Sequence, residues 1–249
     1  MTVAIPESPL FAPLTEHAED VCARLGWKLL RVPEAKAGDL LLKNFADLAL
    51  VSPLGYGLGV GRVDYRLLPG PCVMLNNYTN VAGINFRENL ETVVTCESRT
   101  PDDFLSVMGS MVLAEKFDLD VAVVRKTNAA DVSGADCSID YVQGTQVSAL
   151  DVTEEWWDIT ELPLPVAVWA CRIDADLDHV QEAVEAMQTS NLAPQIVEES
   201  LTTETLPRQG SIIYRWGEDT EKAMMAALEM LFYHQYIPEL PAIKLLGRD

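Results

Sequence analysis

A short polar segment, Ser98-Arg99-Thr100, combines residue types that bind an anionic group. It follows a predicted strand and precedes a predicted helix over residues 101–116. Backbone N–H groups and the positive end of a helix dipole would therefore meet there, which suits a carboxylate or a phosphate. The Arg99 guanidinium could add a bidentate contact to the same group. Ser98, Arg99 and Thr100 are thus candidate ligand contacts.

The same segment also suits a purely structural role. Thr100 has the side chain of a helix N-cap, and Pro101 suits the first helical position. Asp102 and Asp103 follow in the predicted first turn, where they would repel an anion. Capping taken alone favours the structural interpretation.

Two other loops carry polar residues after predicted strands. Glu7 and Ser8 follow the first strand, and Ser52 and Tyr56 lie in the predicted loop after the third. Because the carboxyl ends of parallel strands meet at one edge of a sheet, these loops would face one cleft together with Arg99. Each polar residue taken singly is more often only solvated, so the prediction depends on their convergence.

Three more candidates come from the middle of the chain. Asp140 could place a carboxylate at a strand end, although a surface acid is the simpler interpretation. Thr79 and Asn80 lie in a polar segment where the chain is predicted to cross between two lobes. The complete set of candidate ligand contacts is Glu7, Ser8, Ser52, Tyr56, Thr79, Asn80, Ser98, Arg99, Thr100 and Asp140.

These residues do not identify a chemical reaction. The chain has no G-x-S-x-G, P-loop or H-E-x-x-H motif, and its three histidines share no metal-binding or catalytic spacing. The glycine-rich segment 55–59 lacks dinucleotide-binding spacing. Trp156, Trp157 and Trp169 could stack on a ring-shaped ligand, but aromatic residues in such apolar surroundings are usually core. No catalytic residue is assigned.

The composition is that of an acidic globular protein. The 249 residues are 49% hydrophobic and 22% charged, and 38 acidic against 18 basic side chains give a formal net charge of −20. Nucleic acid and anionic membranes both require a basic footprint, so neither is expected as a partner. A small anionic ligand is still compatible, because a few local donors can outweigh the global field. The sequence indicates no oligomeric state.

The five cysteines are scattered and form no C-x-x-C pair, which fits a reducing compartment better than a disulfide framework. The N-terminal residues lack the pattern of a signal peptide, and no apolar run approaches the roughly 18 residues of a membrane span. We therefore expect a cytoplasmic protein.

The candidate residues need a parallel sheet to position them. Strands at residues 2–5, 27–32 and 47–52 alternate with helices at 14–25 and 35–45. This β-α-β-α-β order predicts parallel strands with helical crossovers. A second such unit runs over 92–124. The apolar run 166–171 predicts a strand that is buried on both faces.

We therefore predict an α/β protein with two lobes around a central cleft. Residues 1–80 and 173–249 would form lobe 1, and residues 81–172 would form lobe 2. Loops at the carboxyl ends of strands make such a cleft a natural ligand site. The alternative is one continuous, doubly wound domain.

The tryptophan-rich stretch carries a family resemblance. Glu155-Trp156, Thr160 to Pro163 and Ala167 to Ala170 resemble the run "E-W-x-x-x-T-G-L-P-F-V-F-A-V-W-A" of the menaquinone-biosynthesis family that includes chorismate dehydratase, of the futalosine pathway. Weaker matches in the same order are Asp47 to Ser52 with "D-V-A-L-I-S", and Ser98-Arg99-Thr100 with "S-R-T-S".

The resemblance implies a periplasmic-binding-protein-like fold of type II. It also implies cytoplasmic loss of water from chorismate, without a metal or an organic cofactor. Matching cleft residues would be Ser52, Ser98, Arg99 and Thr100, with Asp140 a weaker match. The departures from the family lie at the cleft: its first loop reads "P-Y-L-N", where this chain has Pro6-Glu7-Ser8-Pro9, and a family serine is replaced by Gly83.

Two hypotheses follow from these residues. The first is a divergent chorismate dehydratase-like lyase, whose catalytic base the sequence does not identify. The second is a small-molecule-binding protein on the same fold, with a changed ligand and no catalysis. Donors at Ser52, Ser98 and Thr100 in an electropositive cleft would favour the enzyme. An acidic cleft around Glu7 would favour a binding protein with a less anionic, amine-bearing ligand.

Overall fold

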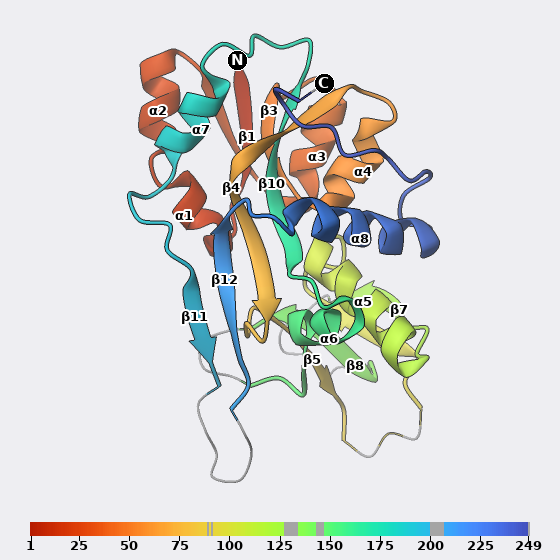
Figure 1. Cartoon of the computed structure of the whole chain (residues 1–249). Helices are drawn as coiled ribbons and strands as arrows, with labels where there is room; N and C mark the ends of the chain where they lie inside the picture. Colours follow the sequence, from red (N-terminus) through yellow and green to blue (C-terminus); the bar gives the residue numbers. More distant parts are fainter. Residues whose placement is uncertain (89, 91, 127–133, 143–146, 200–206, 249) are drawn as a thin grey trace. The chain divides into compact units, whose positions relative to one another are not determined.

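A computed structural model of the chain describes residues 1–88, 90, 92–126, 134–142, 147–199 and 207–248 (Figure 1). The chain divides into two compact units. Unit 1 comprises Met1–Met74, Leu164–Pro194 and Ile213–Asp249, and unit 2 comprises Leu75–Pro163 and Gln195–Ile212.

Unit 1 is built on a mixed sheet whose parallel part matches the predicted β-α-β-α-β order. Strand β1 (Thr2–Pro6) pairs in parallel with β2 (Lys28–Val32) on one side and with β3 (Leu48–Val51) on the other. Strand β10 (Leu164–Arg172) is antiparallel to β3, and all nine of its residues are buried, as the apolar run predicts. This pairing places β10 in unit 1, whereas residues 164–172 were predicted in lobe 2.

Two more strands extend the sheet beyond β10. They are β4 (Tyr65–Asn77) and β12 (Gln209–Arg215), so the hydrogen-bonded order is β12-β4-β10-β3-β1-β2. Both strands run from one unit into the other. At its unit 2 end, β12 pairs with β11 (Gln195–Glu198). Strand β4 is continuous through Pro69-Gly70-Pro71, a sequence that favours a turn.

Helices cover both faces of the unit 1 sheet (Figure 1). Helices α2 (Ala18–Leu25) and α7 (Val180–Met187) pack together on one side. On the other side lie α3 (Glu34–Leu42), α4 (Pro53–Val60) and α8 (Thr220–Tyr233). The predicted helix 14–25 is interrupted, because the short α1 (Ala12–Thr15) ends before α2 begins. Gly26 ends α2 at φ 68°, a left-handed conformation that favours glycine.

Helix α4 corrects the prediction of a loop after the third strand. Pro53 takes the first helical position, and the Ser52 hydroxyl accepts a hydrogen bond from the Gly55 N–H at 3.3 Å. Glycine disfavours helices in general, but here it permits close packing. A Cβ atom on Gly38 of α3 would lie 2.7 Å from the Gly55 Cα. Contact between the two helices therefore requires glycine at this point.

Unit 2 has a five-stranded sheet of order β7-β6-β8-β5-β9. Its strands are β5 (Ala82–Phe86), β6 (Thr95–Ser98), β7 (Ala122–Arg125), β8 (Cys137–Tyr141) and β9 (Leu150–Asp151). Strands β6 and β7 are parallel and are joined by α5 (Phe104–Phe117), which confirms the second β-α-β unit. Helix α6 (Val152–Thr160) packs on α5, and Trp156 is fully buried, as predicted for core.

Helix α5 begins later than predicted. Its N-cap is Asp103, and the Thr100 carbonyl accepts a hydrogen bond from the Asp103 N–H at 3.0 Å in a preceding turn. The residue before a proline disfavours the helical conformation, and the Ser98 hydroxyl holds Thr100 by accepting from its N–H at 3.1 Å. Thr100 therefore belongs to a turn before the helix and does not cap it.

Candidate functional site

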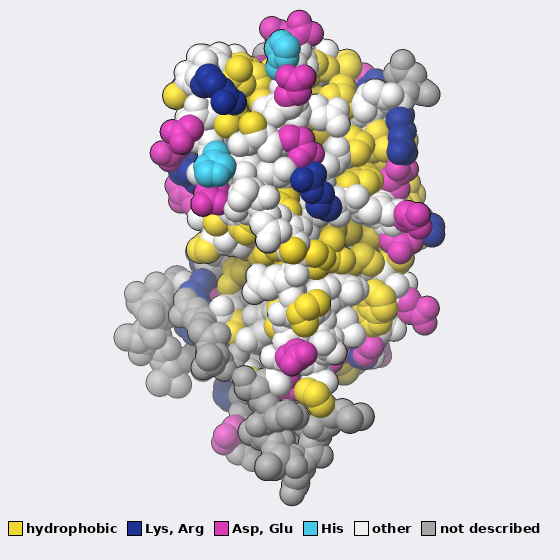
Figure 2. Space-filling view, turned by 60° about the vertical axis from the view of Figure 1, so that its left-hand side comes forward, with side chains coloured by type: hydrophobic (Ala, Val, Ile, Leu, Met, Phe, Trp, Pro, Cys, Tyr) yellow, Lys and Arg dark blue, Asp and Glu magenta, His cyan; other side chains and the backbone are white. Residues whose placement is uncertain are grey.

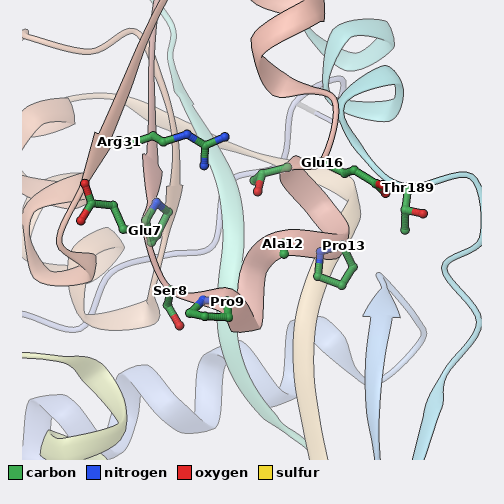
Figure 3. A pocket seen from close by; sticks show the side chains of 10 residues that line it. Glu7, Ser8, Pro9, Ala12, Pro13, Glu16, Arg31 and Thr189 are labelled. Carbon is green, nitrogen blue, oxygen red and sulfur yellow. The ribbon is translucent and has the colours of Figure 1, made fainter.

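The loop after β1 forms one side of an open hollow of about 480 Å³ in unit 1 (Figure 3). The loop is fixed by two hydrogen bonds. The Glu7 N–H donates to the Val32 carbonyl at 3.0 Å, and the Ser8 hydroxyl accepts from the Leu10 N–H at 3.4 Å. The predicted contacts Glu7 and Ser8 thus line a real hollow. Its other lining residues are Pro6, Pro9, Ala12, Pro13, Thr15, Glu16, Arg31 and Thr189.

This hollow is acidic and has rigid walls. Glu7 and Glu16 lie on opposite sides of Arg31 (Figure 3). Arg31 is ion-paired with Glu19 at 3.2 Å, which offsets its positive charge. The neighbouring proline rings provide apolar contact without conformational freedom. The chemistry favours a neutral or amine-bearing group with an apolar body, not an anion.

A smaller and more polar pocket, of about 110 Å³, lies in unit 2. It brings together two predicted contacts, Arg99 and Asp140. One Asp140 carboxylate oxygen accepts a hydrogen bond from the Arg99 N–H at 3.0 Å and pairs with its Nε at 3.3 Å. Asp140 therefore positions both the backbone and the guanidinium of Arg99. The other lining residues are Asn85, Ser138, Tyr141, Val142 and Ser148.

Strand register explains why this pocket is polar. Strands β5 and β8 are antiparallel, with Gly83 opposite Asp140 and Asn85 opposite Ser138. Directly paired residues share a face of the sheet, and so do residues two apart on one strand. All four therefore face the same side. Alternation on β5 and β8 could have indicated Asn85 and Ser138 in the sequence, but only after their pairing was known.

Ser148 joins the pocket from outside the two strands, and no pattern in the sequence indicates it. A Cβ atom on Gly83 would lie 1.8 Å from the Ser148 Oγ. The space that a side chain at position 83 would take is thus filled by the Ser148 hydroxyl. Glycine at position 83 is therefore required for this arrangement.

The Arg99 guanidinium can bind a ligand in addition to Asp140. The ion pair uses Nε, one of five guanidinium N–H donors, and the fork geometry of the guanidinium matches a carboxylate or sulfonate. The Arg99 side chain is 48% exposed, against 18% for Asp140. Hydroxyl and amide groups on Ser138, Ser148 and Asn85 can bond the remaining oxygens of such a group.

The other predicted contacts in unit 2 are committed to internal hydrogen bonds. The Ser98 side chain is fully buried, with its Oγ 2.9 Å from the Ser106 Oγ. The Thr79 hydroxyl is buried 2.8 Å from that of Thr153. These two hydroxyls join elements of unit 2 to each other.

Asn80 is held through its backbone. Its N–H donates to the Asp151 carboxylate at 2.7 Å, and the other Asp151 oxygen accepts from the N–H groups of Thr153 and Glu154 at 3.0 Å. Asp151 thus caps α6, and burial raises the pKa of its carboxyl group. Asn80, with φ 51°, forms the turn that enters β5.

In unit 1, Ser52 caps α4, and Tyr56 is fully buried. The Tyr56 hydroxyl donates to the Ala242 carbonyl at 3.0 Å, and burial raises its pKa. Both residues therefore fix the helix that follows β3.

On the face shown in Figure 2, acidic side chains are dispersed singly and in small groups, and basic side chains lie among them. On this face the acidic side chains therefore form no single patch. Within the described residues, no group of three or more His, Cys, Asp or Glu side chains is arranged to hold a metal ion. The described helices include none with the length and apolar character of a membrane span.

No model of a known protein family matches the chain, and no curated protein matches it in sequence. Solved structures do match over nearly its whole length. Protein AF1704 from Archaeoglobus fulgidus has a TM-score of 0.62 and 13% identity, covering 95% of this chain and 98% of that one. An ABC transporter from Parabacteroides distasonis has a TM-score of 0.57 and 11% identity, covering 100% and 99%.

A third match is the alkanesulfonate-binding protein SsuA from Xanthomonas axonopodis pv. citri, with a TM-score of 0.52 and 10% identity, covering 96% of this chain and 94% of that one. The chain has the periplasmic-binding-protein fold. This confirms the predicted fold class. At such identities the likeness shows the fold and not the activity, because one fold supports many functions.

Proposed function

We propose that this protein binds a small organic acid, whose anionic group is held by Arg99 in the polar pocket of unit 2. The observation that carries the proposal is the double contact of Asp140 with Arg99. It orients a half-exposed guanidinium inside a pocket whose other lining residues are uncharged and, apart from Val142, polar. A preoriented guanidinium loses less entropy when it binds an oxyanion than a free one does.

Two further observations support binding without catalysis. The hydroxyls of Ser52 and Ser98, two of the three donors expected for an enzyme, are engaged in internal hydrogen bonds of the scaffold. The structurally similar SsuA is an alkanesulfonate-binding protein bound to MOPS, so the fold accommodates a small organic anion.

The acidic hollow beside Glu7 and Glu16 lies in unit 1 and is a separate candidate site. Its carboxylates favour an amino group or hydroxyl donors on a ligand of its own.

The test is a thermal-shift screen of small organic acids in chloride buffer at low salt, followed by calorimetric titration of the best ligand. Arg99→Ala should weaken that ligand by about 10- to 100-fold, from the 1.5–3 kcal/mol of a charged hydrogen bond. Arg87→Ala is the matched control, because Arg87 is 51% exposed and pairs with Asp136 at 3.2 Å in the same unit. No stabilising acid, or equal losses in both variants, would refute the proposal.

A chorismate dehydratase-like lyase of menaquinone biosynthesis is the second candidate. It is favoured by Arg99, since a dianionic substrate such as chorismate requires an oriented cation. The direct test is incubation with chorismate and mass spectrometry for the loss of one water. Product in proportion to protein would establish the lyase. The absence of product together with no thermal shift would reject chorismate as substrate and as ligand.

We further propose that the protein acts in the cytoplasm, although proteins of this fold also work outside it. All five cysteines are buried and unpaired, as expected in a reducing compartment. Cell fractionation followed by detection of the native protein tests this; recovery from the periplasm would reject it.

A further inference from the structure

Unit 1 contains a second hollow, of about 440 Å³, that the candidate residues do not reach. It is formed by the start of β4 and the C-terminal segment. That segment is fixed to the strand by two backbone hydrogen bonds: the Leu67 N–H donates to the Lys244 carbonyl, and the Leu246 N–H donates to the Leu67 carbonyl, both at 2.8 Å. The lining residues are Arg66, Glu221, Ile243, Lys244, Leu245 and Arg248.

This hollow is basic in a protein with a net charge of −20. Three cations line it, and among the described residues the carboxylates paired with them are Glu221 and Asp64. Three positive against two negative charges leave an excess of one positive charge among these five groups. An anion that enters such a hollow is attracted locally, although the surface as a whole repels it.

Asp64 organises two of the cations. It pairs with the Lys244 Nζ at 2.7 Å and also with the Arg66 guanidinium. The hydrogen bonds from Lys244 and Arg66 lower the pKa of the Asp64 carboxyl group. Lys244 and Arg66, from segments distant in sequence, are thus held close together, and the Arg66 side chain is only 19% exposed. A ligand would meet cations that are already positioned.

The basic hollow lies at one end of the strands of the sheet, and the loop of Glu7 and Ser8 lies at the other end. The N–H groups of Arg172 and Ile173, at the end of β10, donate to the carbonyls of Asp47 and Asp64 at 3.0 and 3.1 Å. The amino ends of β3 and β4 therefore meet there. The Glu7 loop follows the carboxyl end of β1, which is parallel to β3. The two hollows are thus separate sites.

We propose that this hollow binds an organic phosphate, a dianion with an apolar body. Guanidinium groups such as those of Arg66 and Arg248 match the geometry of phosphate oxygens, and Lys244 adds a point charge. A dianion can draw the cations from their carboxylates more readily than a monoanion can. Ile243 and Leu245 provide an apolar wall for the rest of the molecule.

The probe is phenyl phosphate, titrated calorimetrically into the whole protein in Tris chloride at low salt. The variants are Lys244→Gln and Arg248→Gln, each checked for an unchanged circular dichroism spectrum and melting temperature. The matched control is Lys222→Gln, because Lys222 is an exposed cation of α8 that pairs with Asp219 and does not line the hollow. Lys222→Gln removes one positive charge, as each of the two test variants does.

We expect Lys244→Gln and Arg248→Gln each to weaken phenyl phosphate about tenfold, and Lys222→Gln to leave it within about twofold. Benzoate, a monoanion with the same ring, should bind at least tenfold more weakly than phenyl phosphate. The absence of saturable binding overturns the proposal. Equal losses in all three variants would mean only a general charge effect, and equal affinity for benzoate would remove the phosphate preference; both results also overturn it.

Discussion

The contact between Gly83 and Ser148 gives the sharpest test of the polar pocket. In the variant Gly83→Ala, the new Cβ would lie 1.8 Å from the Ser148 Oγ and 2.3 Å from its Cβ. Neither separation is physically possible, so Ser148 must move or β5 must shift. Overpacking of this kind costs about 1–3 kcal/mol. Replacing glycine within a strand returns about 0.5–1 kcal/mol. The net loss in free energy of unfolding should be about 0.5–2 kcal/mol.

A double-mutant cycle with Ser148→Gly separates this clash from other effects of the substitution. Ser148→Gly removes the two atoms that the new Cβ would overlap, and leaves only the Val142 Cγ2 at 3.3 Å. The double variant should therefore recover most of the loss, with a coupling energy of about 1 kcal/mol or more. The assay is urea unfolding of the four proteins, with the slope on urea checked for constancy.

The reasoning would be refuted by a coupling energy near zero, since that would mean that Gly83 and Ser148 do not share the space. The four proteins also report on function. If the Ser148 hydroxyl contacts the ligand, Gly83→Ala and Ser148→Gly should each weaken the organic acid found in the screen. Both should do so at a temperature where the proteins remain folded.

Three further outcomes are expected. Tyr56→Phe should lower the free energy of unfolding by about 1–3 kcal/mol, because it leaves the Ala242 carbonyl without its 3.0 Å donor and the Lys244 N–H without its 3.3 Å acceptor; the calorimetric affinity for the organic acid held by Arg99 should not change. Gly38→Ala should lower the free energy of unfolding, measured in urea, by about 1–2 kcal/mol, because the new Cβ would meet the Gly55 backbone at 2.7 Å. An unchanged urea midpoint would contradict this close packing of α3 on α4. Asp136→Asn should destabilise the protein at pH 7, and by less at pH 3, which is below the unfolded pKa. Hydrogen bonds, chiefly from backbone N–H groups, lower the pKa of the Asp136 carboxyl, so its stabilisation is present above the unfolded value of 3.8 and is lost as the pH falls through the lower folded value. Equal destabilisation at both pH values in urea titrations would contradict this.

Much of the scaffold could be predicted because its signals are local. The apolar run of β10 predicts a strand buried on both faces, and Gly26 marks the end of α2. The β-α-β-α-β order implies parallel strands through chain connectivity alone. These features depend on the period of the hydrophobic residues and on the conformational limits of glycine, both of which are properties of short segments.

Helix α4 could not be predicted, because its stability depends on contacts with residues outside the segment. Four residues of segment 53–60 are proline or glycine, which predict a loop by propensity. The helix is stable because Ser52 caps it and because Gly38 and Gly55 let α3 and α4 approach closely. That gain comes from a second helix, and intrinsic propensity does not include it.

The candidate site also has a part that the sequence predicts and a part that depends on the tertiary structure. The sequence by itself determined that Arg99 and Asp140 carry the charges suited to a small ligand, and that Glu7 makes the first loop acidic. Only the tertiary structure decided which residues share a pocket. The register of β5 and β8 places Asn85 and Ser138 beside Asp140, and the missing side chain of Gly83 admits Ser148. A shift of one residue in that pairing would turn one strand's set of side chains to the other face of the sheet. Residue types are local information, whereas register is set by the packing of the whole unit.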